Sequence, residues 1–174
     1  MPPAASDVYH GVTVTDEWRW LEDSDSAAVA DWTERQNLAT RAVLETSPRR
    51  PALRRHLERL LSIGTLGTPH PRQGRYFYMR RQGDQNHAVL HLRDGSPEAP
   101  ERIVLDPNQW SVEGTEALDW YYPDRQGRRL AFGRSSGGDE LSRLRVMDVD
   151  SGATLEEIPH TRACSLAWLP DGSG

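Results

Sequence analysis

The chain has 174 residues, 36% of them hydrophobic and 27% charged, which is typical of one globular domain or of parts of two. Its formal net charge of −5 argues against nucleic-acid binding, which normally requires a basic surface. No apolar run approaches the roughly 18 residues of a membrane span. The single cysteine, Cys164, excludes an internal disulfide framework, and no secretory signal is visible at the N-terminus. We therefore expect a cytoplasmic protein without nucleic-acid or membrane partners.

Two helices are predicted in the first 62 residues. The first runs from Ala27 to about Glu45, after N-cap candidates at residues 24–26, and ends before Pro48. Its apolar positions recur at helical spacing at Val29, Trp32, Ala39 and Val43. The second begins near Pro51, where proline is tolerated because first-turn amides have no partner within a helix. Its apolar face is formed by Leu53, Leu57, Leu60 and Leu61.

After Gly67 the hydrophobic period changes to two and turn residues become frequent. Short strands are predicted at Arg75–Met79, Ala88–Leu92, Arg102–Leu105, Arg129–Phe132, Leu144–Val149 and Ser165–Trp168. The connections are rich in Gly, Asp and Pro, and no helical pattern interrupts them. This arrangement indicates an all-β sandwich, barrel or propeller.

An internal repeat favours the propeller. The tetrapeptide Arg-Gln-Gly-Arg occurs at 72–75 and again at 125–128, and each copy opens a strand. Each strand then meets a Gly-Asp turn, at 83–84 and at 138–139, and a later turn contains Gly95 or Gly152. The segment that begins with Trp120 also recurs, in shorter form, at Trp168. Periods of about 40–50 residues with four strands each are typical of propeller blades.

The length after residue 67 allows about two blades, whereas a closed propeller needs at least about four. The turn at 170–174 lacks the strand that it should open. We therefore expect a mainly β fold with an α-helical N-terminal extension and about two four-stranded blades of an incomplete propeller. The chain would then be the first part of a longer protein. The apolar faces of its helices would lack a partner, which favours self-association.

The sequence resembles the prolyl oligopeptidase family of serine peptidases. The strongest segment is 7–11 followed by 16–23, which is similar to the family's Tyr-His-Gly and its later Trp-Leu-Glu-Asp. Further matches follow in order along the chain: Gln36-Asn37, Tyr76–Tyr78, Gly83, Gln85-Asn86, Val89-Leu90, Leu105–Asn108, Gly114-Thr115, Ala117-Leu118, Ser135, Gly138-Asp139, Ala167-Trp168 and Asp171-Gly172. The Trp-Leu-Glu-Asp segment is more similar to the post-proline branch than to the oligopeptidases that cleave after basic residues.

This resemblance implies a seven-bladed propeller that caps an α/β-hydrolase domain and restricts substrates to short peptides. Residues 1–62 would be an arm and two helices that pack on that C-terminal hydrolase domain, and residues 63–174 would be the first blades. The catalytic Ser, Asp and His, the oxyanion hole and most of the proline pocket would lie beyond Gly174. The whole protein would hydrolyse short proline-containing peptides after proline, and residues 1–174 alone would be inactive. The family's pocket-lining aromatic is absent near Ala163 and Cys164, so that role is not assigned.

Two alternatives stay open at this point. The chain could belong to a non-enzymatic propeller that binds a protein partner, or to a related oligopeptidase with specificity for basic residues. In every case we expect no catalytic, cofactor-binding or metal-binding residue within the chain itself.

The segment Gly133–Gly137 matches the G-x-S-x-G pattern of a hydrolase nucleophile, with Ser135 at its centre and Asp148 and His160 following in hydrolase order. A nucleophile elbow needs a strand, a strained turn and then a helix. The residues after Ser135 instead predict a turn and another strand. We therefore expect Ser135 to lie in a hairpin between blade strands.

Other chemically suggestive residues have simpler structural explanations. His87 and His91 would share one face of a strand about 13 Å apart, at roughly 3.3 Å per residue, which is too far for one metal ion. His10 is expected to pin the N-terminal arm through a hydrogen bond. Trp18, Trp20 and Trp32 are expected to pack that arm and helix, and Cys164 to be a small buried residue. Charged residues expected at the surface are Glu22, Asp23, Asp25, Arg49, Arg50, Glu156 and Glu157.

Overall fold

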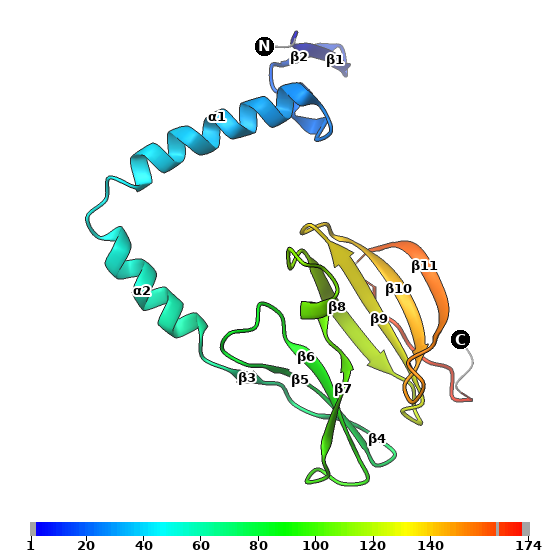
Figure 1. The fold of residues 1–174 in the computed structure, drawn as a ribbon. Coiled ribbons are helices and arrows are strands. Elements are labelled where there is room, and N and C mark those ends of the chain that lie inside the picture. The colour runs from blue at the N-terminus through cyan, green and yellow to red at the C-terminus, as the bar shows by residue number, and fades with distance from the viewer. Residues whose placement is uncertain (1–2, 163, 172–174) are drawn as a thin grey trace. The chain divides into compact units, whose positions relative to one another are not determined.

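The computed structural model describes residues 3–162 and 164–171, and these form helices and antiparallel strands (Figure 1). By contacts between residues the chain divides into two compact units, Met1–Glu58 and Arg59–Gly174. The predicted mainly β fold with an α-helical N-terminal part is confirmed. Position 163 and the end of the predicted turn at 170–174 lie outside the described residues.

The first unit begins with a hairpin that the sequence analysis did not predict. Strands β1 (Ala5–Tyr9) and β2 (Val12–Asp16) pair antiparallel. They are joined through His10 and Gly11, both at positive φ, 51° and 82°. Two successive residues of this kind form the turn whose twist suits a two-residue hairpin. The Tyr-His-Gly segment is thus, in this structure, a turn signal.

The two predicted helices are confirmed. Helix α1 (Ala27–Leu44) follows a short 3₁₀ turn, η1 (Arg19–Glu22), and its N-cap Ser26 accepts a hydrogen bond from the amide of Ala28 at 3.3 Å. Helix α2 (Arg50–Leu61) contains the boundary between the two units. Its leucines remain exposed, with 57% of Leu53, 45% of Leu57 and 47% of Leu60 accessible to solvent.

The second unit contains two antiparallel sheets, each built in chain order. The first sheet is formed by β3 (Thr65–Leu66), β4 (His70–Arg72), β5 (Arg75–Arg81), β6 (Val89–Asp94) and β7 (Glu101–Leu105). Its order is β3-β5-β6-β7, and β4 also pairs with β5. The first strand of this sheet is therefore divided into two short pieces, with Pro69 between them.

The second sheet has four strands in the order β11-β10-β9-β8. They are β8 (Glu116–Pro123), β9 (Arg129–Ser136), β10 (Leu141–Asp148) and β11 (Thr154–Arg162). A short 3₁₀ turn, η2 (Pro107–Gln109), precedes it. Its register shifts between Leu118 and Trp120, so that Asp119 forms a bulge in β8.

The predicted repeat is confirmed by the matching hairpins of the two sheets. The Arg-Gln-Gly-Arg copies lie between β4 and β5 and between β8 and β9. The Gly-Asp turns lie between β5 and β6 and between β9 and β10, and the turns with Gly95 and Gly152 open the last connection of each sheet. Each sheet is therefore one four-stranded blade, and the described residues contain two consecutive blades.

The two blades share a hydrophobic core. The buried apolar side chains in contact are Phe77, Leu90, Leu92, Leu105, Leu130, Phe132, Met147 and Val149. Burial of such side chains from water is the main source of stability for the pair of sheets.

Polar contacts also join the blades, in a group that we call the interblade clamp: Arg75, Asp94, Arg102 and Asp150. The Arg75 guanidinium donates to the Gly127 carbonyl at 2.8 Å and to the Asp150 carboxylate at 2.7 and 2.9 Å. Arg102 donates to the Val149 carbonyl at 3.0 Å and to Asp150 at 3.0 Å. Asp94 accepts from both arginines within the first blade.

One predicted strand is wrong. Residues 165–168 have extended character in the sequence but no assigned strand in the structure. A strand exists by its ladder of hydrogen bonds to a neighbour. Within the described residues this segment pairs with no other strand, and its contact to β8 is instead a side-chain hydrogen bond from Trp168.

Candidate functional site

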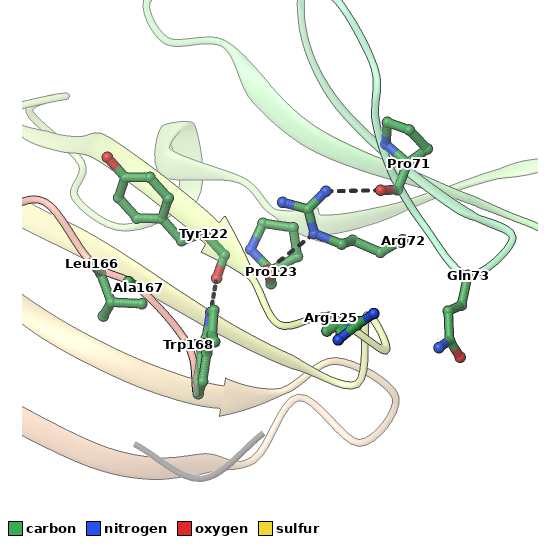
Figure 2. A pocket seen from close by; sticks show the side chains of 9 residues that line it. All are labelled: Pro71, Arg72, Gln73, Tyr122, Pro123, Arg125, Leu166, Ala167 and Trp168. Carbon is green, nitrogen blue, oxygen red and sulfur yellow. Dashed lines mark hydrogen bonds between the residues drawn. The ribbon is translucent and has the colours of Figure 1, made fainter. Parts of the chain in front are cut away.

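A groove of about 610 Å³ lies where the first strands of the blades end (Figure 2). Three chain segments line it, and the first two have corresponding places in the repeat. They are Pro71–Gln73, Tyr122–Arg125 without the buried Asp124, and Leu166–Trp168. The repeat therefore brings segments about 50 residues apart in the sequence to one site.

The first wall of the groove is the end of β4 and the turn that follows it. Gln73 and Gly74 both have positive φ, 45° and 83°, which makes a two-residue turn and leaves Arg72 as the last residue of the strand. Arg72 donates from Nη1 to the Pro71 carbonyl at 2.8 Å and from Nε to the Pro123 carbonyl at 3.4 Å. These two bonds fix its guanidinium across the junction of the blades.

The second wall is the turn after β8, which is held by a buried carboxylate. Asp124 is only 2% exposed and accepts a hydrogen bond from the amide of Arg128 at 2.8 Å. Gly127 has a φ of 70°, and a Cβ at this position would lie 2.9 Å from the side chain of Arg75, so the turn needs glycine here. Arg125 is exposed on this rigid turn and lines the groove.

The third wall is aromatic. The indole Nε1 of Trp168 donates to the Tyr122 carbonyl at 3.0 Å, which holds the ring against β8 (Figure 2). Pro71, which is exposed, and Pro123, which is buried, also belong to the lining of the groove. The neighbouring Tyr121 has its pKa raised by burial, against the opposing effect of Arg72.

The charge of the groove is positive and uncompensated. Its lining contains Arg72 and Arg125 but no carboxylate. Within the described residues neither guanidinium forms a salt bridge, whereas other arginines of the blades are paired with acids. Such pairs are made by Arg75, Arg80, Arg93, Arg102, Arg134, Arg143, Arg145 and Arg162. The groove can therefore supply cationic donors to an anion next to an apolar wall.

Ser135, the centre of the G-x-S-x-G match, lies in β9 and is buried. Its Oγ donates to Asp119 Oδ1 at 2.7 Å, and Ser142 donates to the other oxygen of the same carboxylate. The chain after Ser136 makes a tight turn and enters β10 instead of a helix, so the predicted hairpin position is correct. That Ser135, Asp148 and His160 have no catalytic role stays a prediction.

The glycines of this motif have structural explanations. A Cβ on Gly133 would lie 2.4 Å from the ring of Trp120, which is its cross-strand partner. Gly137 has a φ of 65° in the turn between β9 and β10. Glycine is thus required at both positions for packing and for backbone conformation.

The two histidines considered as metal ligands do not share a strand, and that part of the prediction is wrong. β6 begins at Val89, so His87 lies in the preceding loop, where its Nε2 lies 2.9 Å from the Gly114 carbonyl. The loop is held there because Asn108 bonds to both the amide and the carbonyl of His87. Within residues 3–162 and 164–171, no cluster of three potential metal ligands occurs.

His91 is buried in β6, where its ring stacks on Tyr78 with centroids 5.6 Å apart. Its Nδ1 lies 3.9 Å from the carboxylate of Glu101, which also accepts from Tyr78 and pairs with Arg80. Burial lowers the pKa of His91, and the nearby Arg80 lowers it further. Hydrogen bonds from Tyr78 and Arg80 lower the pKa of Glu101, against its desolvation. His91 is thus a neutral packing residue at neutral pH.

The remaining predicted residues lie as follows. His10 is exposed in the first hairpin and makes no hydrogen bond among the described residues, so the expected bond is not found. Trp20 and Trp32 pack edge to face with centroids 6.2 Å apart, whereas Trp18 is half exposed. Cys164 is a free, partly exposed thiol, so its expected burial is not found among the described residues. The charged residues expected at the surface are exposed: Glu22, Asp23, Asp25, Arg49, Arg50, Glu156 and Glu157.

Sequence reasoning did not identify the groove. Arg72 and Arg125 were recognised as equivalent members of the repeat, and that equivalence was the available signal for their common position. What the repeat could not show is that the first arginine of each copy faces a groove while Arg75 joins the interblade clamp.

No helix among the described residues is long and apolar enough to cross a membrane. Residues 2–174 match the protein family described as the prolyl oligopeptidase N-terminal β-propeller domain. The prolyl endopeptidase of Elizabethkingia meningoseptica is 27% identical over 168 residues, which are 95% of this chain and 23% of that protein. Prolyl oligopeptidase A of Galerina marginata is 27% identical over 184 residues, which cover 94% of this chain and 25% of that protein.

Solved structures show the same fold. One from a structural and mechanistic analysis of two prolyl endopeptidases superposes with a TM-score of 0.85 at 35% identity, over 97% of this chain and 25% of that one. Prolyl oligopeptidase B from Galerina marginata, bound to a 35mer hydrolysis and macrocyclization substrate, gives a TM-score of 0.77 at 18% identity, over 98% and 27%. The chain spans about a quarter of the length of the relatives that it matches.

Proposed function

Because the chain belongs to the prolyl oligopeptidase family, as its N-terminal β-propeller domain, we propose that it is the first part of a serine peptidase that cleaves short peptides after proline. The main support for this proposal is the family match over residues 2–174. Within this range the arm, the helices and the two blades follow one another without interruption. Two of the relatives are named prolyl endopeptidases, and these names support proline as the residue before the bond that the proposed peptidase cleaves.

In this proposal the described chain has an architectural role. Residues 1–62 form an arm and two helices that pack on a C-terminal α/β-hydrolase domain, and residues 63–174 form the first blades of a gate that admits short peptides. The exposed leucines of α2 support a packing role, because a helix with one apolar face normally buries it against another element. Ser-His-Asp acyl transfer would be carried out by residues of the hydrolase domain.

The cellular location is a further part of the proposal. A single cysteine, present as a free thiol, is compatible with the reducing conditions of the cytoplasm. Short proline-containing peptides would be the substrates there.

The proposed activity is tested by expressing the full-length protein and measuring hydrolysis of blocked chromogenic dipeptides that differ only in the residue before the chromophore. Proline at this position should give the highest kcat/KM, with arginine and alanine as controls. A preference for arginine would overturn the proline assignment and favour a basic-residue oligopeptidase. No hydrolysis of any of the three would favour a propeller that only binds a partner.

A second measurement tests whether the nucleophilic serine lies outside residues 1–174. A fluorophosphonate that labels activated serines should label the full-length protein and should leave residues 1–174 unlabelled, because the proposal places the nucleophile in the hydrolase domain. Labelling or peptide hydrolysis by residues 1–174 would contradict it.

A further inference from the structure

The repeated tetrapeptide places one arginine of each copy in the same groove. Arg72 and Arg125 occupy the first position of their copies: Arg72 is the last residue of β4, and Arg125 lies in the turn after β8. Figure 2 shows both guanidinium groups on the side of the groove where the two hairpins meet. The fourth position of the first copy, Arg75, belongs to the interblade clamp instead. Two first-position cations therefore line one groove because the two blades repeat one local structure.

Among the described residues neither of these two cations forms a salt bridge, unlike the arginines of the clamp and Arg134. The clamp arginines share Asp94 and Asp150, and Arg134 pairs with Glu116. Arg72 is held by two carbonyl groups, which orient a guanidinium without neutralising it. Arg125 makes no contact with an acid within the described residues, and the one acid of its turn, Asp124, is buried and bonded to backbone.

The remaining walls of the groove are suited to the uncharged part of a peptide chain. Trp168 and the exposed Pro71 offer ring surface in the lining of the groove, and the Gln73 side chain offers an amide at its rim. Flat aromatic and proline rings bind extended, proline-containing segments, whose backbone is already ordered. An inorganic anion would gain nothing from such a wall.

We propose that this groove binds the C-terminal carboxylate of a short, proline-containing peptide, with Arg72 and Arg125 as its cationic donors and Trp168 beneath the chain. This rests on the proposed function, since it names the feature of the substrate that the blades recognise. A planar guanidinium such as that of Arg125 accommodates a carboxylate in two parallel hydrogen bonds. Arg72 already donates from Nε and Nη1 to carbonyl groups, so it would contribute its remaining N–H groups, and its fixed orientation reduces the cost of ordering it.

The test uses the full-length protein and two N-acetylated hexapeptides of identical sequence with one internal proline. One ends in a free carboxylate and the other in a carboxamide. The acid should have a KM about fivefold lower than the amide, as expected for one partly exposed charge-assisted contact. This preference should decrease in about 0.5 M salt, where charges are screened within a few Å.

Arg125→Gln should remove the preference for the acid, and Arg125→Glu should reverse it. Neither change is expected to impair folding, because the Arg125 side chain is exposed and supports no other described residue. The matched control is Arg128→Gln, which removes the same charge from the same turn but does not line the groove. It should retain the preference for the acid.

The outcomes separate the two claims. Cleavage after proline with equal KM for acid and amide, or a preference unchanged by Arg125→Gln, overturns the carboxylate site and leaves the peptidase proposal intact. If neither peptide is cleaved, the peptidase proposal fails. Calorimetric titration of both peptides into parent and Arg125→Gln protein then tests the carboxylate site. The proposal requires that the parent binds the acid more tightly than the amide and that Arg125→Gln does not.

Discussion

Ser135 illustrates how a catalytic pattern can arise from packing requirements. Gly133 leaves space for Trp120, Gly137 turns the chain, and Ser135 satisfies one oxygen of Asp119. Each residue of the apparent motif thus has a local structural task.

We predict that Ser135→Ala in the full-length protein keeps kcat within a factor of about two to three, while it lowers the free energy of unfolding by roughly 1 kcal/mol through the lost hydrogen bond to Asp119. Ser136→Ala, at the exposed end of β9, should change neither quantity. A loss of kcat by several orders of magnitude in folded Ser135→Ala would identify this serine as the nucleophile.

His91 should make stability depend on pH. Its pKa is lowered in the folded state by burial and by Arg80, so the unfolded chain binds its proton more readily. The folded protein should therefore lose stability as pH falls below the ordinary value of 6.5. Lowered carboxylate pKa values, such as that of Glu101, act mainly below pH 4.5.

Urea unfolding at several pH values above 5 checks this prediction. His91→Gln should flatten the pH dependence relative to the parent, whatever its effect on stability at neutral pH. The exposed His10→Gln is the control and should preserve the slope. An unchanged slope in His91→Gln would assign the dependence to other groups.

At the scale of elements, the residues of the interblade clamp should contribute unequally to the stability of the pair of sheets. Arg75→Gln removes donors to the Gly127 carbonyl and to two acids, and should cost about 1–3 kcal/mol because a partly buried carbonyl loses its partner. Asp150→Asn should cost less than about 1 kcal/mol, since this side chain is exposed and Arg102 retains Asp94.

Chemical denaturation of both variants measures the difference, with Arg128→Gln as a control outside the clamp. Added salt should reduce the difference in the free energy of unfolding between parent and Asp150→Asn. It should reduce the corresponding difference between parent and Arg75→Gln less. Equal losses from the two variants would mean that the bond to the Gly127 carbonyl contributes little.

The strands differ in how well the sequence predicted them, for physical reasons. β5, β6 and β9 carry buried apolar residues and were found. β8 was missed because the bulge at Asp119 breaks its alternation, and β11 because it is an exposed edge strand with Glu156, Glu157 and Pro159. The hairpin of β1 and β2 is mostly exposed and has no buried face to mark it.

The candidate site was less predictable than the fold. The repeat indicated that Arg72 and Arg125 are equivalent, but charge pairing decides which arginines remain available, and pairing depends on contacts between residues such as Arg75 and Asp150, which are 75 positions apart in the sequence. The aromatic wall depends in turn on a hydrogen bond from Trp168 to Tyr122, which no sequence pattern specifies.

At the scale of the whole molecule, residues 1–174 should self-associate when expressed alone. The exposed leucines of α2 form an apolar face, and contiguous faces of this kind favour association in water. The double variant Leu53→Glu/Leu57→Glu should shift the chain toward monomer in sedimentation velocity, whereas Arg55→Glu on the polar face should not. A parent chain that sediments as a monomer would contradict this expectation.

The strand order has a consequence for how the blades form. In the two sheets β3 pairs with β5, and each of the other strands pairs with a strand that directly precedes or follows it in the chain, so all pairings are local in sequence. Contacts of short sequence separation close small loops and form early, so topologies of this kind have low contact order. A ribosome that releases the chain residue by residue would therefore expose one complete meander before the next is synthesised, and each blade could serve as the template on which its successor condenses.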